Sequence, residues 1–477
     1  MSGRRSFAED TALSSILEVL GRIARLVGVV VLARMLGAEH FGVISSLLAY
    51  AGLLVVVTDL GINHYITTVG FDVVSSAERN SIVTLKSFMM LLYFGLLALA
   101  ATGVPGYQQV VFWILGGSVA LSSVLDSFFA YLRAVHKFAL EGWLRFSSSL
   151  TFLIIVLLLL MPLRSERALM AAAAIYIASA LVPLLLALVR LRFGSIKTLL
   201  AGKFEGGQVQ LLLTSILPLS VASIFGVIYN SIDLAMLGWF GLYEEAGIYG
   251  VAVRAAGLAA LFGAVLVRNT LPLLSRMGTD ITARRGRLLV LQSFLTLALI
   301  AVPILLVAKA LSVPLFQLVF GETFAPTSTV FVVLVAGVAV NWFVLQRMFF
   351  SIALQQRWQV AMISVLAAIF NVAGNYWLIP IMGAPAAALT TLASYFIMLM
   401  LYGALQKQLF GLSKLITNRQ GRLLLRAVFL TACLGVGLSI WGTPQTFWAL
   451  AGQAAFVVAI SIPYVRTILI PLWAHGE

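Results

Sequence analysis

Residues 15–36 read SILEVLGRIARLVGVVVLARML, an apolar segment that a few charges interrupt. An α-helix rises about 1.5 Å per residue, so a segment of this length crosses the roughly 30 Å hydrocarbon core of a bilayer. The rest of the chain continues the pattern, because 61% of its 477 residues are apolar, 10% are charged and the mean hydropathy is +1.05. This composition excludes a soluble enzyme and a disordered protein, and it predicts an all-α integral membrane protein.

Charged, glycine and proline clusters divide the chain into fourteen predicted membrane-spanning helices. The connections between them are short, and the longest on the outer face, 309–329, has roughly twenty residues, too few for an extramembrane domain. The helices are expected near 15–36, 42–64, 82–102, 109–132, 146–163, 168–190, 211–237, 246–270, 288–308, 327–350, 359–379, 383–405, 423–441 and 446–466.

Lysines and arginines predict how these helices are oriented. If the N-terminus is cytoplasmic and the helices alternate in direction, 26 of the 31 basic residues fall on the inner side and four on the outer side. A wrong number of helices would scramble this division, so it supports both the predicted number of membrane-spanning helices and a topology with both termini in the cytoplasm. The formal net charge of +14 is then a consequence of topology, and no nucleic-acid partner is expected.

Several chemical functions have no matching residues in the sequence. The single cysteine, Cys433, cannot form an intrachain disulfide, and no Cys/His cluster suits a metal ion. A Gly-x-x-x-x-Gly-Lys nucleotide loop is also absent from the sequence. We therefore expect a transporter rather than an enzyme, without a cofactor, and leave open whether Na⁺ or H⁺ drives it.

An internal repeat relates the two halves of the chain. Leu32–Gly37 and Phe41–Val43 correspond to Leu234–Gly238 and Tyr249–Val251, so in both copies a helix ends at Leu-Gly and the next opens with aromatic-Gly-Val. Transporters are commonly built from such repeats, with the substrate path between them. The repeat predicts two six-helix lobes and a pair of C-terminal helices, with boundaries at 1–204, 205–406 and 407–477.

Several motifs resemble those of one transporter family. Arg34–Gly42, followed by Asp59–Ile62, resembles the opening signature of the polysaccharide-transporter (Wzx-like) flippases of the multidrug/oligosaccharidyl-lipid/polysaccharide (MOP) exporter superfamily. The resemblance implies the fold of the multidrug (MATE) exporters and a lipid-linked oligosaccharide as substrate. Further matching segments lie at 217–218, 232–238, 246–252, 320–326, 378–380 and 383–390.

Charges deep in a membrane helix are costly, so they are candidates for function. Glu18, Arg22 and Arg25 lie at i, i+4 and i+7, on one face of the first helix. Arg25 lies about 13 Å from the inner end of that helix, and Arg254 about 10 Å from the outer end of the eighth. We predict that these arginines line a central cavity and grip a pyrophosphate, as the resemblance also implies. The alternatives are an Arg22–Glu18 pair, snorkelling of the arginines to headgroups and a structural ion pair for Arg254.

Other polar residues inside the predicted helices have two interpretations each. Asp126 is a candidate counter-ion for an arginine or part of a proton or sodium site, and Asp59 is either a similar group or a helix cap. Asn371 and Asn375, at i and i+4, either line the cavity or form interhelical hydrogen bonds. Pro218 is either a hinge or a static kink in the seventh predicted helix.

The sequence thus predicts a flippase that moves a polyprenyl-pyrophosphate-linked oligosaccharide from the inner to the outer leaflet by alternating access. Its expected partners are this substrate, membrane lipids and the polymerase and glycosyltransferases of glycan assembly. The alternatives are a cation-coupled multidrug exporter of the same superfamily and a non-transporting scaffold for glycan assembly.

Overall fold

The computed structural model describes most of the chain, and every regular element in the described part is a helix. The chain divides into two compact units, Met1–Gly250 and Val251–Glu477. Pro218 and the predicted helices at 423–441 and 446–466 lie outside the described residues. The structure describes residues 2–59, 62–69, 76–158, 166–190, 221, 224–229, 231–276 and 284–406.

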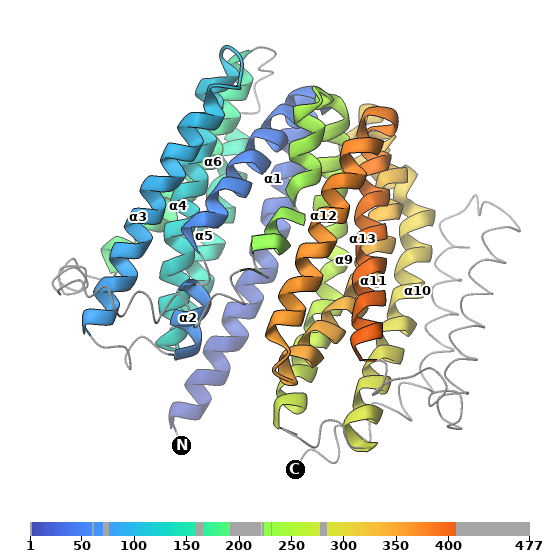
Figure 1. The fold of residues 1–477 in the computed structure, drawn as a ribbon. Helices are drawn as coiled ribbons and strands as arrows, with labels where there is room; N and C mark the ends of the chain where they lie inside the picture. Colours follow the sequence, from blue (N-terminus) through green and yellow to red (C-terminus); the bar gives the residue numbers. More distant parts are fainter. Residues whose placement is uncertain are drawn as a thin grey trace, which may run out of the picture. The chain divides into compact units, whose positions relative to one another are not determined.

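The first unit is a bundle of long helices (Figure 1). Its helix α1 packs along α5, while α6 packs against both α4 and α5, and the short α2 packs on α4. The elements are α1 (Ser2–Val55), η1 (Val56–Thr58), α2 (Ile62–Val69), α3 (Ser76–Ala101), α4 (Gln108–Ala134), α5 (Phe138–Leu158) and α6 (Glu166–Arg190). Residues 231–239 form a further helical segment of this unit.

Helix α1 contains the first predicted span and most of the second. The two are separated at Gly37, where φ is +74° and ψ is 173°, a conformation that glycine adopts without steric cost. The second span was predicted to reach residue 64, but α1 ends at Val55. The physical reason lies at Asp59, whose side-chain Oδ1 accepts a hydrogen bond from the backbone N–H of Asn63 at 3.1 Å and so caps α2.

Glycines of the internal repeat allow two backbones of the first unit to approach closely. A Cβ atom on Gly42 would lie 2.7 Å from the carbonyl carbon of Tyr243, and one on Gly247 would lie 2.8 Å from that of Ala38. Ser46 would obstruct a Cβ atom on Gly238 in the same way. Small residues at such a crossing are typical of membrane helices, where close packing replaces the hydrophobic effect.

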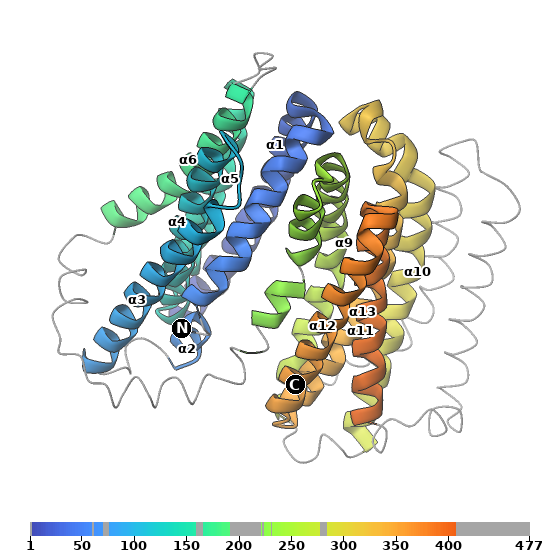
Figure 2. The same cartoon turned by 45° about the horizontal axis from the view of Figure 1, so that its top comes forward.

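The second unit contains the remaining described helices, and α9 enters it from the first unit. Within it, α13 packs against both α11 and α12, and α10 packs along α11 (Figure 2). The elements are α9 (Tyr243–Arg276), α10 (Arg284–Phe320), η3 (Glu322–Phe324), α11 (Thr327–Ala353), α12 (Arg357–Met382) and α13 (Ala384–Leu405).

Two further predicted helix boundaries are wrong, and at both of them a charged residue lies inside the helix rather than at its end. Helix α5 begins at Phe138 rather than 146, and α10 continues past Lys309 to Phe320 although Pro303 and Pro314 lie inside it. Much of the predicted outer connection 309–329 is therefore helical. A charge near a helix end snorkels or pairs within the turn and does not require a break.

Nine helices in the described part of the chain are long and apolar enough to cross a membrane. Many of their large apolar side chains point outward, including Leu91, Leu318 and Trp377, which are 72%, 79% and 72% exposed. Exposed apolar surface on this scale is unfavourable in water and is the surface that a bilayer covers.

Candidate functional site

A cavity of about 460 Å³ lies inside the first unit, between α1, α4, α5 and α6. Three arginines and two carboxylates contribute to its wall, so the charged side chains sum to +1. The structure thereby brings together three of the residues that the sequence singled out, Arg22, Arg25 and Asp126. The charged side chains of the wall are Glu18, Arg22, Arg25, Asp126 and Arg145.

Arg22 forms a salt bridge with Glu18, one turn earlier on α1. Its Nη2 donates to Glu18 Oε1 at 2.5 Å, and the two side chains are 46% and 50% exposed. Exposed i, i+4 pairs stabilise a helix by about 0.3–0.5 kcal/mol, so this pair is easily exchanged for a stronger one. Arg22 is therefore a cation of the cavity wall that a ligand can recruit.

Arg25 has more fixed surroundings. Its guanidinium carbon lies 3.9 Å from the centre of the Phe152 ring on α5 and 5.2 Å from that of Tyr176 on α6. Its Nη1 also donates a hydrogen bond to Ser179 Oγ at 3.3 Å. Cation–π contacts contribute about 0.5–2 kcal/mol and hold the guanidinium in place. Arg25 is thus fixed in the cavity wall by side chains of α5 and α6.

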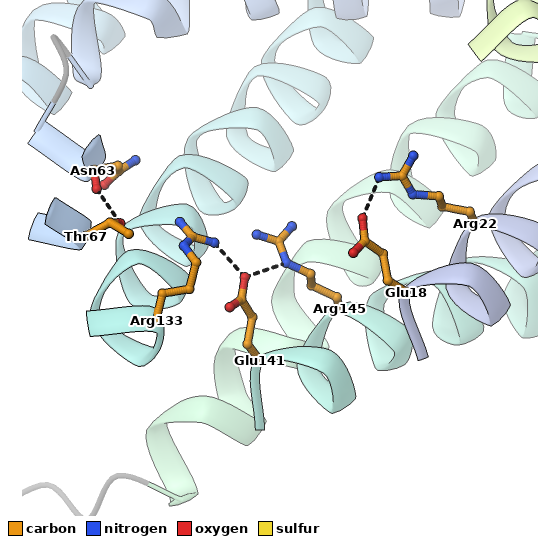
Figure 3. A network of polar contacts seen from close by, with 7 residues as sticks. All are labelled: Glu18, Arg22, Asn63, Thr67, Arg133, Glu141 and Arg145. Carbon is orange, nitrogen blue, oxygen red and sulfur yellow. Dashed lines mark hydrogen bonds and ion pairs between the residues drawn. The ribbon is translucent and has the colours of Figure 1, made fainter. Parts of the chain in front are cut away.

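Arg145, a residue that the sequence did not single out, is the third arginine of the cavity. Glu141 Oε1 accepts hydrogen bonds from Arg145 Nε at 2.9 Å and from Arg133 Nη1 at 2.6 Å (Figure 3). The guanidinium of Arg145 also lies 4.1 Å from the centre of the Phe129 ring. Glu141 is 6% exposed, and a buried carboxylate requires such partners. The arrangement orients Arg145 before any ligand binds.

The sequence contained a signal for Arg145. Glu141, Arg145, Ser148 and Phe152 recur at helical spacing and form one face of α5. The predicted helix began at 146, which assigned Arg145 to the inner connection. Figure 3 shows Arg145 between Glu141 and the Glu18–Arg22 pair, so the residue belongs to the cavity and not to a loop.

Asp126 is the exposed carboxylate on the α4 side of the cavity. Within the described part of the chain it accepts no hydrogen bond and lies in no salt bridge. Arg145, Lys86 and Arg133 are the cations whose fields reach it. One turn before Asp126, Ser123 Oγ accepts a hydrogen bond from Lys86 Nζ at 3.1 Å and also bonds to Thr58 Oγ1 at 2.6 Å. Asp126 is thus free to meet a ligand.

The other predicted site residues lie elsewhere. Asn371 and Asn375 are buried between α12 and α13, where Asn375 Nδ2 donates to Asn371 Oδ1 at 3.1 Å and Thr390 donates to Asn375. Asn371 Nδ2 in turn donates to Thr391 Oγ1 at 3.5 Å. Arg254 lies half-buried in α9, in the second unit, and Asp59 caps α2.

The chain resembles known proteins in both sequence and fold. The sequence model of the polysaccharide biosynthesis protein family matches residues 7–278, more than half of the chain. The chain belongs to this family. The family resemblance predicted from the sequence is thereby confirmed, and the motif at Arg34–Gly42 lies within the matched residues. No curated protein sequence matched the chain.

Solved structures show which fold this member of the polysaccharide biosynthesis protein family adopts. The inward closed conformation of the lipid II flippase MurJ matches with a TM-score of 0.69 at 14% identity, over 96% of this chain and all of that one. An inward-facing multidrug resistance MATE transporter of the MOP superfamily matches with a TM-score of 0.60 at 10% identity, over 83% of this chain and 98% of that one. A mutant of the Vibrio cholerae MATE transporter VcmN matches with a TM-score of 0.52 at 14% identity, over 86% of this chain and 99% of that one. The chain is a multi-pass membrane protein with the MurJ/MATE fold.

Proposed function

We propose that the protein is a flippase that moves a polyprenyl-pyrophosphate-linked oligosaccharide from the inner to the outer leaflet. The observation that carries this proposal is the cavity with Arg22, Arg25 and Arg145 in its wall, inside a bundle of membrane-length helices. Three cations in a low-dielectric bilayer attract an anionic group, and guanidinium groups bind phosphate oxygens in pairs. Membership of the polysaccharide biosynthesis protein family supports a saccharide as the rest of the substrate.

The proposed binding step exchanges one anion for another. In the structure Arg22 pairs with the exposed Glu18, a weak interaction. A diphosphate takes the place of Glu18 and accepts two parallel charge-assisted hydrogen bonds from the guanidinium of Arg22. Arg25 stays in place through its aromatic contacts, and Arg145 through its contact with Glu141. The charge of the substrate head is neutralised before it crosses the bilayer.

The architecture that we propose for transport has fourteen helices in two six-helix lobes, 1–204 and 205–406, followed by two helices in 407–477. Both termini lie in the cytoplasm of a prokaryotic cell in this scheme. The lobes alternate between inward and outward access, and Pro218 serves as a hinge. Arg254 supplies a further cation for the pyrophosphate, and Asp126 or Asp59 takes part in Na⁺ or H⁺ coupling.

Reconstitution tests this function. Proteoliposomes containing the full chain are expected to translocate a fluorescent polyprenyl-diphosphate oligosaccharide, measured as its loss of protection from an external quencher, with and without Na⁺ and pH gradients. Arg22→Gln should reduce the rate at least tenfold, whereas Arg190→Gln, an exposed arginine at the end of α6, should leave it unchanged. Equal rates for protein-containing and protein-free vesicles would refute the proposal.

Arg254 has its own test in cells. Arg254→Ala should abolish export of the surface glycan while the amount of protein in the membrane stays unchanged. Normal surface glycan in that strain would remove Arg254 from the substrate path.

A multidrug exporter is the second candidate, favoured by the structural match to a multidrug resistance MATE transporter. Many exported drugs are cations, and a cavity whose charged residues sum to +1 repels them. Efflux of ethidium from vesicles, with no translocation of the lipid-linked oligosaccharide, would favour this candidate over the flippase.

A further inference from the structure

We propose that the α4 side of the cavity is a saccharide subsite, in which Asp126 and Ser122 accept hydrogen bonds from sugar hydroxyl groups next to the arginines that bind the diphosphate. This inference rests on the proposed flippase function and adds to it the residues that recognise the sugar. It assigns Asp126 to substrate recognition instead of charge compensation, and it leaves Asp59 as the carboxylate proposed for Na⁺ or H⁺ coupling.

The serine side chains of the cavity show why this wall accepts hydrogen bonds. A hydroxyl has one proton to donate and two lone pairs to accept with. Ser122 Oγ donates its proton to the backbone oxygen of Ser118 at 2.9 Å, and Ser118 Oγ donates to that of Leu115 at 2.7 Å. Ser148 Oγ, on α5 rather than on α4, likewise donates to the backbone oxygen of Ser179 at 2.7 Å. With these protons used, the hydroxyls offer acceptor lone pairs to the cavity.

Asp126 adds two more acceptor oxygens to the same wall. It follows Ser122 by one helical turn, so the two side chains share a face of α4. The carboxylate is exposed in the cavity, and no hydrogen bond or salt bridge to a described residue occupies it. Ionised carboxylates accept from two donors at once, and charge-assisted hydrogen bonds of this kind are the stronger class.

The donors of the cavity lie on other helices. Arg22 belongs to α1 and Arg145 to α5, and guanidinium groups donate hydrogen bonds but cannot accept them. A ligand that pairs with both the arginine donors and the acceptors on α4 carries an anionic acceptor group beside a group rich in O–H or N–H donors. A diphosphate joined to a sugar ring has this composition, whereas a diphosphate alone leaves Asp126 without a partner beside a second anion.

The volume of the cavity limits how much of the oligosaccharide can contact its wall. At about 460 Å³ it falls within the usual range for small-ligand sites, about 300–1,000 Å³. This space suits the diphosphate and the sugar next to it rather than a whole oligosaccharide. The subsite therefore selects for the first sugar and is indifferent to the outer ones.

A pair of matched probes tests the inference with the purified full chain in detergent. Dissociation constants are measured by thermophoresis for a fluorescent polyprenyl diphosphate and for the same lipid carrying one N-acetylglucosamine or one galactose. The readout is the ratio of the constants for the bare and sugar-bearing lipids. The wild type should prefer at least one sugar-bearing lipid, and Asp126→Asn should reduce that preference about tenfold.

Two further variants separate a sugar contact from other roles. Ser122→Ala, which removes an exposed hydroxyl, should reduce the preference about threefold, and it preserves the test if Asp126→Asn does not fold. Arg22→Gln should weaken binding of all probes equally, leaving the ratio unchanged. If Asp126 is a counter-ion instead, Asp126→Asn will tighten binding of the bare and sugar-bearing lipids alike, which overturns the inference.

The probes also separate failure of the inference from failure of the proposed function. Equal binding of bare and sugar-bearing lipids by the wild type would overturn the saccharide subsite and leave a lipid-diphosphate site. No binding of any diphosphate lipid would overturn the flippase proposal, and the subsite with it.

Discussion

The close approach at Gly42 leads to a quantitative prediction for Gly42→Ala. The added Cβ atom would lie 2.7 Å from the carbonyl carbon of Tyr243 and 2.8 Å from the backbone nitrogen of Gly247, whereas real Cβ contacts stay above 3.0 Å. The carbonyl oxygen of Tyr243 would lie nearer still, and backbone atoms cannot rotate away, so the two segments must separate by more than about 1 Å to reach normal contact distances. A gap of that size forfeits about half or more of the dispersion energy along the crossing, and overpacking of this kind costs about 2–3 kcal/mol.

Gly52→Ala is the matched control, because Gly52 lies on the same helix and, among the described residues, no atom outside that helix lies within 4 Å of an added Cβ. Alanine has the higher helix propensity, so this variant should be unchanged or more stable by up to about 1 kcal/mol. Thermal unfolding in detergent, followed by size-exclusion fluorescence, should show Gly42→Ala melting about 2–4 °C below Gly52→Ala. Equal melting temperatures for the two variants would refute the close crossing of α1 with residues 238–247.

Three further experiments test individual contacts by the same melting assay. Glu141→Gln keeps the shape of the side chain but removes the charge that Arg133 and Arg145 share, so it should cost about 1–3 kcal/mol, and an unchanged melting temperature would contradict the triad. A double-mutant cycle of Arg25→Ala with Phe152→Leu should give a coupling of about 1 kcal/mol, and a coupling of zero would exclude the cation–π contact. Asn375→Ala should cost about 1 kcal/mol, typical of a hydrogen bond between membrane helices, and a loss of export without loss of stability would assign Asn375 to transport instead.

The helices themselves were largely predictable from the sequence. Apolar segments of membrane length gave the positions of α4, α6, α11, α12 and α13 to within a few residues. The errors at Phe138 and Phe320 arose where charged residues or prolines lie inside a helix, because hydropathy alone does not distinguish a charge that pairs within a turn from one in a connection.

The candidate site was predictable where its residues share one helix. Glu18, Arg22 and Arg25 recur with the helical period, so their common face followed from spacing, and so did the Arg22–Glu18 alternative, which the structure contains. The partners of Arg25 were not predictable, because Phe152 and Tyr176 come from two other helices. Residues more than a hundred positions apart meet through packing, which no local pattern encodes.

The sequence by itself determined that the chain is a membrane protein, where most of its helices run and to which family it belongs. Those properties depend on the transfer of side chains from water to lipid, a sum over local segments that does not require the packing of the helices. Tertiary structure decided which charges face one cavity, that Arg145 is among them and that Asp126 forms no hydrogen bond or salt bridge with another described residue. The physical reason is that the interaction free energy of a buried charge depends on the groups within a few ångströms of it, and those groups come from different helices.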